Sequence, residues 1–177
     1  ADAMVTGGTR HHAATIEKLN KIVEARPGEI IFGLTMLVSK GRTVFVADTN
    51  VHDNPTAEQL VEIAVSSTRV ARLFGFDPKV AFLSHSTFGK PATVRTKHVR
   101  EAMNLMKSKK IDFDYDGEMQ PDVALDPGYK ASYPFSKIVG NANILIMPAL
   151  HSASISVKLM KTFGGAKLIG PLLIGLS

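Results

Sequence analysis

Residues 112–125, DFDYDGEMQPDVAL, place a run of carboxylates in a chain that is otherwise basic. In the first half of this stretch apolar and acidic residues alternate, as they do along a strand with one buried face. The pattern predicts a strand that turns Phe113 and Tyr115 toward the core and ends at Gly117. Pro121 suits the first turn of a short helix. We therefore expect a strand followed by a polar turn at the rim of a cleft.

A calcium-binding loop is the alternative for the same stretch. The residues that match the first, third, fifth and sixth positions of an EF-hand loop are Asp112, Asp114, Asp116 and Gly117. The twelfth position requires a bidentate Glu, and this chain has Val123 there. The missing ligand favours the strand.

Strands and helices alternate on both sides of this stretch. Apolar, β-rich segments at residues 30–38 and 43–47 flank a Ser-Lys-Gly-Arg turn, which predicts a hairpin. Thr56 and Gln59 match a capping box that opens a helix. Further strands are predicted at residues 79–83, 143–147, 167–169 and 172–176. Further helices are predicted at residues 12–24, after the loop that ends at residue 93 and through residue 110, and at residues 151–163. This order predicts an α/β three-layer sandwich, and the hairpin makes its sheet mixed.

Two of these helices have apolar residues at helical spacing, which predicts the face that each one buries. The residues expected to point inward from the first are Val99, Ala102, Met103 and Met106. In the second, Ile155, Leu159 and Phe163 recur at helical spacing.

Composition limits the function. Of the 177 residues, 45% are hydrophobic and 21% are charged, as in ordinary globular proteins. The absence of cysteine excludes disulfides, thiolate metal sites and a cysteine nucleophile. No apolar window is long enough for a membrane span and no signal peptide opens the chain, so we expect a cytoplasmic protein without a membrane partner. Both ends are abrupt, which indicates a piece of a longer chain.

The net charge is +5, but the basic residues are scattered and are not interleaved with aromatic residues. Nucleic-acid binding is therefore disfavoured, and a small anionic ligand, phosphorylated or CoA-like, explains the surplus equally well.

Ligands of open α/β sheets bind beyond the carboxyl ends of the strands. Three predicted loops leave such ends, at residues 48–54, 84–90 and 149–154. The second, SHSTFGK, combines hydroxyls, free backbone N–H groups and one lysine, which suits a phosphate. A loop that merely satisfies its own backbone is the alternative. A serine hydrolase is disfavoured because no G-x-S-x-G motif is present, and the six histidines show no metal-ligand spacing.

Several segments together resemble the phosphate acetyl/butyryltransferase family. They are ADAMVTGG (1–8), NPTAEQL (54–60), LSHSTFGKP (83–91), DGEMQPDVAL (116–125), YPFSKIVGNANILIMPALHSASIS (133–156) and GGAKLIGPLLIGLS (164–177). The last three are most similar to the version of this domain at the C-terminal end of large NADP-dependent malic enzymes. The resemblance spans the whole chain in order.

The resemblance implies an isocitrate/isopropylmalate-dehydrogenase-like architecture with two α/β subdomains. Residues 1–25 would close the first subdomain, and residues 26–177 would form the second, truncated at its C-terminal exit. It also implies a homo-oligomer that pairs through the second subdomain.

The family reaction moves an acetyl group from acetyl phosphate to CoA, and its main arginine, serine and aspartate follow the point where this chain stops. An arginine typical of the first helix is replaced by Glu17 and Lys18, which is not conservative. The resemblance therefore implies a regulatory module that senses acetyl-CoA and has no catalytic residue or cofactor of its own. NADP and a divalent metal, Mg or Mn, would serve the malic-enzyme part of the parent, which converts malate to pyruvate and CO2. A working phosphate acetyltransferase and a purely structural oligomerisation module are the alternatives.

The candidate site combines loop position with this resemblance. The residues expected to contact phosphate or CoA are Ser84, Ser86, Thr87 and Lys90. A neighbouring wall is expected from Gly140, Asn141 and Asn143. Asp116 and Glu118 are expected at the rim as orienting groups.

Overall fold

The computed structural model describes residues 5, 15, 18–19, 22–91, 93 and 96–177. The apolar residues 3–6 predict the end of a short strand, and most of this segment lies outside the described residues, as does most of the helix expected at residues 12–24. Residues 24–26 run beside the C-terminal residues, because Ser177 N–H donates to the Glu24 carbonyl and Arg26 N–H to the Gly175 carbonyl.

One six-stranded sheet organises the molecule, in the order β4-β3-β5-β2-β1-β6. The strands are β1 (Phe32–Ser39), β2 (Arg42–Ala47), β3 (Lys79–Leu83), β4 (Asp114–Met119), β5 (Ile144–Ile146) and β6 (Lys167–Ile174). β2, β5, β3 and β4 are parallel, whereas β1 is antiparallel to both of its neighbours. The predicted mixed sheet is confirmed.

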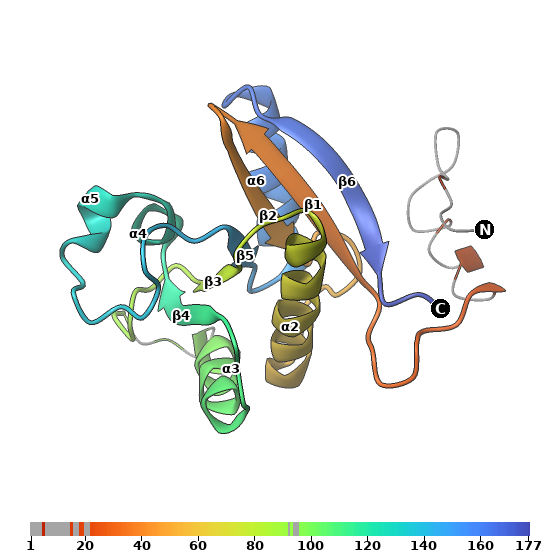
Figure 1. Cartoon of the computed structure of the whole chain (residues 1–177), viewed down its shortest axis with the longest axis horizontal. Coiled ribbons are helices and arrows are strands. Elements are labelled where there is room, and N and C mark those ends of the chain that lie inside the picture. The colour runs from red at the N-terminus through yellow and green to blue at the C-terminus, as the bar shows by residue number, and fades with distance from the viewer. Residues whose placement is uncertain (1–4, 6–14, 16–17, 20–21, 92, 94–95) are drawn as a thin grey trace.

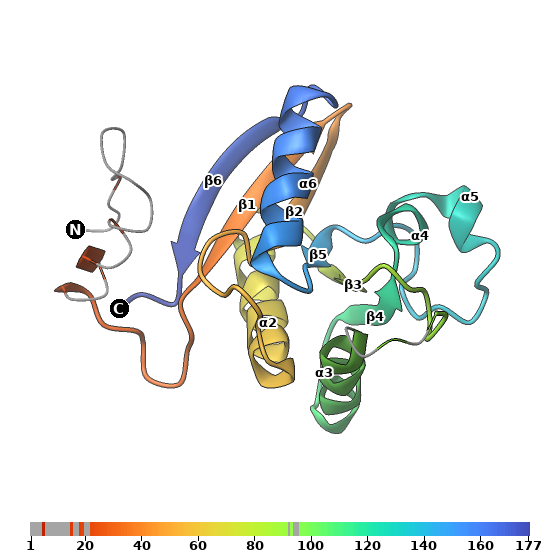
Figure 2. The same cartoon turned by 180° about the vertical axis from the view of Figure 1, so that it is seen from behind.

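Helices cover both faces of this sheet. They are α2 (Ala57–Leu73), α3 (Lys97–Ser108), α4 (Pro121–Leu125), α5 (Pro127–Lys130) and α6 (Leu150–Thr162). Figures 1 and 2 show α2 and α3 side by side on one face and α6 on the other. Among the described residues, every helix is too short or too polar to span a bilayer.

The hydrophobic core is divided by the sheet into two clusters. Phe45 and Phe82 lie in the cluster beneath α2 and α3, and Leu83 and Leu145 lie in the one on the α6 side. Because neighbouring strand residues point to opposite faces, the two clusters share the same strands. The parallel strands are therefore buried from both sides, as their apolar sequences predict.

The local signals in the first half of the chain work as expected. Lys40 and Gly41, both at positive φ, form the two-residue turn of the β1–β2 hairpin. The Thr56–Gln59 capping box at the start of α2 is present in both directions. All four apolar residues expected to face inward from α3 are buried.

The helix predicted from the spacing of Ile155, Leu159 and Phe163 is present as α6, but these residues do not face the core. Ile155, Leu159 and Phe163 are 58%, 60% and 95% exposed, and the buried residues of the helix are Ala153 and Val157. The helix has apolar residues on two faces, and the smaller ones allow it to approach the sheet closely. The larger ones form a stripe on its outer surface.

The acidic strand also differs from its prediction, because β4 does not end at Gly117 but continues to Met119. Gly117 has φ +152°, and a Cβ there would lie 2.7 Å from the Phe82 carbonyl oxygen of β3. Glycine therefore allows the strand to continue past a close contact. The two last strands predicted are one strand, β6, whose pairing with β1 shifts register near Gly170 and Pro171.

Candidate functional site

A cleft of about 670 Å³ lies at the carboxyl ends of the parallel strands. All three loops expected at this edge contribute to it: the segment after β2 through Asn54, the one after β3 through Ser84, and the one after β5 through Ala149. The full lining is Asn54, Pro55, Leu83, Ser84, His85, His98, Pro121, Met147, Pro148, Ala149, His151, Ser152 and Ser156. The position obeys the rule for ligand sites in open α/β sheets.

The chemistry of this lining suits a ligand that carries negative charge. It includes no carboxylate, three histidines, and the first residues of α6. The N-cap residue Ala149 makes no side-chain hydrogen bond to that helix end. The Leu150 N–H donates to the Asp53 carbonyl, and the N–H groups that follow it in the first turn are left to face a ligand with their positive partial charge. His98 Nε2 lies 3.0 Å from the Pro148 carbonyl oxygen, which can only accept, so this nitrogen carries a proton.

Ser84 and Ser86 occupy different positions in this site. Ser84 lines the cleft and is 8% exposed, whereas Ser86 is fully buried behind it. The Ser86 hydroxyl donates to Glu118 Oε1 over 2.5 Å. Ser86 is therefore placed to support the loop, and of the four residues expected to contact the ligand only Ser84 lines the cleft. A ligand contact at Ser84 stays a prediction.

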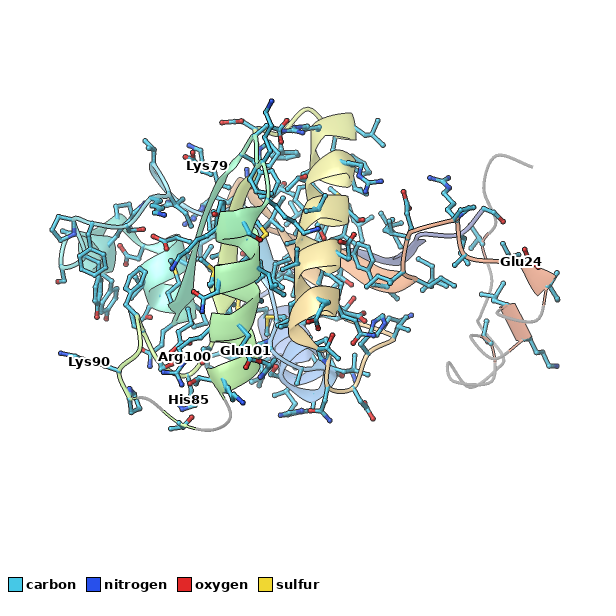
Figure 3. The ribbon with its side chains drawn as sticks, turned by 90° about the horizontal axis from the view of Figure 1, so that it is seen from below. Glu24, Lys79, His85, Lys90, Arg100 and Glu101 are labelled. Carbon is cyan, nitrogen blue, oxygen red and sulfur yellow. The ribbon has the colours of Figure 1, made fainter. Side chains whose placement is uncertain are left out.

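Thr87 and Lys90 form the ends of a tight turn. Their backbones exchange two hydrogen bonds around Phe88 and Gly89, which have φ of 48° and 86°. Thr87 Oγ1 accepts the N–H of Gln120. Lys90 is exposed, and Figure 3 shows its side chain pointing outward, away from the sheet.

An aromatic cluster, not foreseen from the sequence, supports this turn. The Phe88 ring lies 5.5 Å from Tyr133 and 4.8 Å from Phe135, measured between ring centroids. The Phe88 N–H donates to the Glu118 carbonyl over 2.7 Å. These contacts fix the loop against the irregular segment that follows α5.

The wall expected from Gly140, Asn141 and Asn143 is wrong in its position. Asn143 accepts the N–H of Lys79 and donates to the Asp77 carbonyl, which places it where β3 begins. Figure 3 shows Lys79 at the opposite end of the molecule from His85. The three residues precede β5, so they lie at the amino ends of parallel strands and face away from the cleft.

Two lysines donate hydrogen bonds to the backbone carbonyl groups around Gly140. Lys130 Nζ donates to the Ile138 and Gly140 carbonyls, and Lys79 Nζ donates to the Val139 carbonyl over 2.7 Å. Burial and the nearby Lys79 lower the pKa of Lys130 below its ordinary value. This edge is a structural clasp formed by the chain itself.

The rim position expected for Asp116 and Glu118 is also wrong, because both are buried. Asp116 is 7% exposed and accepts the N–H groups of Gly117 and Lys137. Glu118 is 1% exposed and lies beneath the loop that carries Ser84. Asp116 anchors a neighbouring segment, and Glu118 supports the cleft from behind.

Asp48 is a site residue that sequence reasoning missed. Its carboxylate accepts the N–H groups of Gly33, Asn50, Val51 and His52, and it lies 2.8 Å from His52 Nδ1. Burial acts to raise the pKa of Asp48, but the hydrogen bonds from His52, Gly33 and Asn50 outweigh it and lower the pKa. The residue holds the loop after β2 against the cleft. The spacing of Asp48 and His52 was the available signal.

Within the described part of the chain, no group of three or more His, Asp or Glu side chains is placed to hold a metal ion. His85, His98 and His151 line the same cleft but are not placed to hold a metal ion.

The fold and the site together define an α/β protein with a ligand cleft at the carboxyl edge of a mixed sheet. Sequence comparison makes this class specific. The chain belongs to the phosphate acetyl/butaryl transferase family, which matches it over residues 1–177. The resemblance read from the motifs is confirmed.

Relatives fall into two groups. The chain is 47% identical to the NADP-dependent malic enzyme of Rhizobium meliloti, over 99% of this chain and 23% of that protein. It is 36% identical to the phosphate acetyltransferase of Corynebacterium glutamicum, over 100% of this chain and 54% of that protein. The crystal structure of a phosphotransacetylase from Streptococcus pyogenes superposes with a TM-score of 0.90 at 33% identity, over 100% of this chain and 55% of that one. The chain thus spans about a quarter of this malic enzyme and about half of the acetyltransferase.

Proposed function

We propose that this chain is the phosphotransacetylase-like part of an NADP-dependent malic enzyme, where it binds acetyl-CoA and regulates the enzyme. The observation that carries the proposal is the cleft, which has no carboxylate in its lining and one helix N-terminus at its wall. The 47% identity to a malic enzyme supports the choice of parent. A ligand that binds one state of an oligomer more tightly than another shifts the equilibrium between them.

The dimensions and polarity of the cleft suit part of an acyl-CoA molecule. About 670 Å³ lies within the range of small-molecule sites, and Leu83 and Met147 provide apolar surface. The first turn of α6 offers N–H groups to a phosphate. Ser84, which follows Leu83 directly and lines the cleft, contacts the ligand in this proposal.

The larger architecture is part of the proposal. Residues 1–25 would close a first subdomain and residues 26–177 would form a second, in an isocitrate/isopropylmalate-dehydrogenase-like arrangement. NADP and a divalent metal, Mg or Mn, would bind in the malic-enzyme part of the parent and not to this chain.

We further propose that two copies of the chain pair through α6. Its outer stripe of Ile155, Leu159 and Phe163 is exposed, and the helix has two lysines and no acidic residue. An antiparallel pair centred on Leu159 would bury both stripes. Pairing through the edge strand β6 is disfavoured, because Pro171 cannot donate a ladder hydrogen bond.

Thermal unfolding with acetyl-CoA tests the sensor. A ligand that binds only the folded state raises stability with the logarithm of its concentration, by about 2.7 kcal/mol at a hundred times its Kd. We expect the melting temperature to rise with acetyl-CoA. ATP, which has phosphates and adenine but no pantetheine arm, is the control. A protein that shows no shift with any CoA species but dimerises with concentration would be a structural module.

A working phosphate acetyltransferase is the second candidate, favoured by the superposition on a phosphotransacetylase. The discriminating measurement is the formation of acetyl-CoA from acetyl phosphate and CoA. Turnover by the purified protein would establish the transferase, and acetyl-CoA binding without turnover would support the sensor.

A further inference from the structure

A chain of buried polar groups runs from the cleft into the protein. Ser84 Oγ, at the cleft, lies 3.3 Å from Ser86 Oγ, and Ser86 Oγ lies 2.5 Å from Glu118 Oε1. The other carboxylate oxygen, Glu118 Oε2, makes no hydrogen bond and lies 3.8 Å from Arg100 Nε. Glu118 is fully buried, whereas the Arg100 side chain reaches the surface. The negative charge of Glu118 is therefore compensated by Arg100, which lies on the side of Glu118 away from Ser86.

The available protons fix which group donates in each hydrogen bond from Ser84 through Ser86 to Glu118. A carboxylate only accepts hydrogen bonds, so the single hydroxyl proton of Ser86 is used on Glu118. The bond between the two serines then requires Ser84 to be the donor. Ser86 N–H also points to Ser84 Oγ, over 3.4 Å. A hydroxyl oxygen has two lone pairs, so Ser84 is left with one acceptor site and no free proton.

We propose that Glu118, acting through Ser86, makes Ser84 a hydrogen-bond acceptor in the cleft, so that this position takes an N–H group of the ligand and not an anionic oxygen. The inference rests on the proposed function: in an acyl-CoA ligand, the matching groups are the amides of the pantetheine arm. The phosphates would then lie at the first turn of α6. Glu118 and Ser86 are positioning residues, and Ser84 sets the specificity.

Substitution of Glu118 by glutamine should reverse the direction. Glutamine has nearly the same shape, and its carbonyl oxygen is favoured beside the Arg100 guanidinium. Its amide N–H group then faces Ser86 and donates to it. Ser86 in turn donates to Ser84, and the Ser84 proton becomes free for the cleft. The replacement of one buried carboxylate oxygen by an amide nitrogen would thus turn Ser84 from an acceptor into a donor in the cleft.

The test compares two probes: pantetheine, which is neutral and has amide N–H groups, and sulfate, whose oxygens carry no proton at neutral pH and only accept. Dissociation constants are measured by calorimetry for the unaltered protein, Glu118→Gln and Ser84→Ala. We expect Ser84→Ala to weaken pantetheine binding about tenfold and to leave sulfate binding within about twofold, as the loss of one hydrogen bond would. Glu118→Gln should shift the ratio of the two constants in favour of sulfate by about tenfold or more.

Two controls match these changes chemically. Glu101→Gln alters an exposed carboxylate on α3, and Ser108→Ala alters a hydroxyl that bonds only to the Leu105 carbonyl. Neither should move the ratio. If Glu118→Gln fails to fold, Ser84→Ala carries the test, because it leaves the Ser86–Glu118 bond in place.

The outcomes separate this inference from the proposed function. Acetyl-CoA binding together with an unchanged ratio in Glu118→Gln overturns the inference and leaves the sensor standing. If the ratio of the two dissociation constants shifts as expected in Glu118→Gln but the protein does not bind acetyl-CoA, the inference is supported and the sensor function is ruled out. An unaltered protein that does not bind pantetheine, or a Ser84→Ala protein that binds it equally well, overturns the inference.

Discussion

Single carboxylates are used as anchors in this protein. Asp48, Asp116 and Glu118 are all buried, and each accepts hydrogen bonds that hold a neighbouring loop. A buried carboxylate is costly unless such donors surround it. Each carboxylate has one donor from a distant segment, which is Gly33 for Asp48, Lys137 for Asp116 and Ser86 for Glu118. Each anchor therefore ties together two segments that are far apart in the sequence.

Asp48→Asn should destabilise the protein in a pH-dependent way. The pKa of Asp48 is lowered in the folded state, so its contribution is present above the ordinary pKa of aspartate and is lost as pH falls through the folded value. Asparagine accepts fewer bonds and turns an N–H group toward N–H donors. We expect a loss of about 2 kcal/mol at pH 7 that shrinks near pH 3, measured by urea unfolding.

The control for this change is Asp77→Asn, because Asp77 is exposed and uses only its backbone carbonyl in a described hydrogen bond. An equal loss in the two variants, or an Asp48→Asn loss that does not depend on pH, would contradict the anchor.

The first turns of two helices differ in whether their N–H groups are capped by side chains. The start of α2 is closed by a reciprocal pair, in which Thr56 Oγ1 accepts the Gln59 N–H and Gln59 Oε1 accepts the Thr56 N–H. The start of α6 has no such cap and opens on the cleft. The first arrangement favours stability, and the second leaves donors for a ligand.

Thr56→Ala should lower the free energy of unfolding by about 1 kcal/mol, the usual value of an N-cap. Chemical denaturation followed by circular dichroism measures the change. Thr56→Ser keeps the accepting hydroxyl and should retain most of the stability. If the serine variant loses as much as the alanine variant, the hydroxyl is not the source of the effect.

The two faces of the sheet are covered unequally. The helices α2 and α3 cover one face, and α6 covers part of the other (Figure 2). Large apolar side chains of α6 remain outside, including Phe163 at 95% exposure. Isolated exposed apolar residues are common, but a stripe along a helix marks an interaction surface.

Leu159→Glu should abolish dimerisation without lowering the stability of the single chain, because Leu159 is 60% exposed. Analytical ultracentrifugation over a range of concentrations measures the effect. Leu73→Glu is the matched control, since Leu73 is 86% exposed at the end of α2 and should leave the dimer intact. An Leu159→Glu protein that dimerises normally would rule out α6 as the interface.

Much of the fold was predictable from local patterns. The β1–β2 hairpin follows from a Lys-Gly turn that allows positive φ, and β3 matches its predicted bounds because its apolar run is short and clearly bordered. The face of α3 was predictable because its apolar residues form one stripe. For α6 the same rule failed, since two faces are apolar and only packing chooses between them.

The candidate site was predictable in its place but not in its chemistry. Loop positions follow from strand order along the chain, so the carboxyl edge and Ser84 could be predicted. The burial of individual polar residues could not be predicted from the sequence, and therefore Glu118 was expected at the rim. The position of Asn143 was also predicted wrongly. The sequence does not distinguish an asparagine that faces a cleft from one that bonds to the backbone of a neighbouring strand, as Asn143 does with Lys79.

The sequence by itself determined the alternation of strands and helices, the mixed sheet and the family, because these depend on periodicity, turn residues and ordered motifs. Only the tertiary structure decided which polar groups line the cleft. Hydrogen-bond direction at Ser84 depends on Ser86 and on Glu118, which is 32 residues from Ser86 in the chain. Such a partnership comes from the pairing of β3 with β4, and no local pattern specifies it.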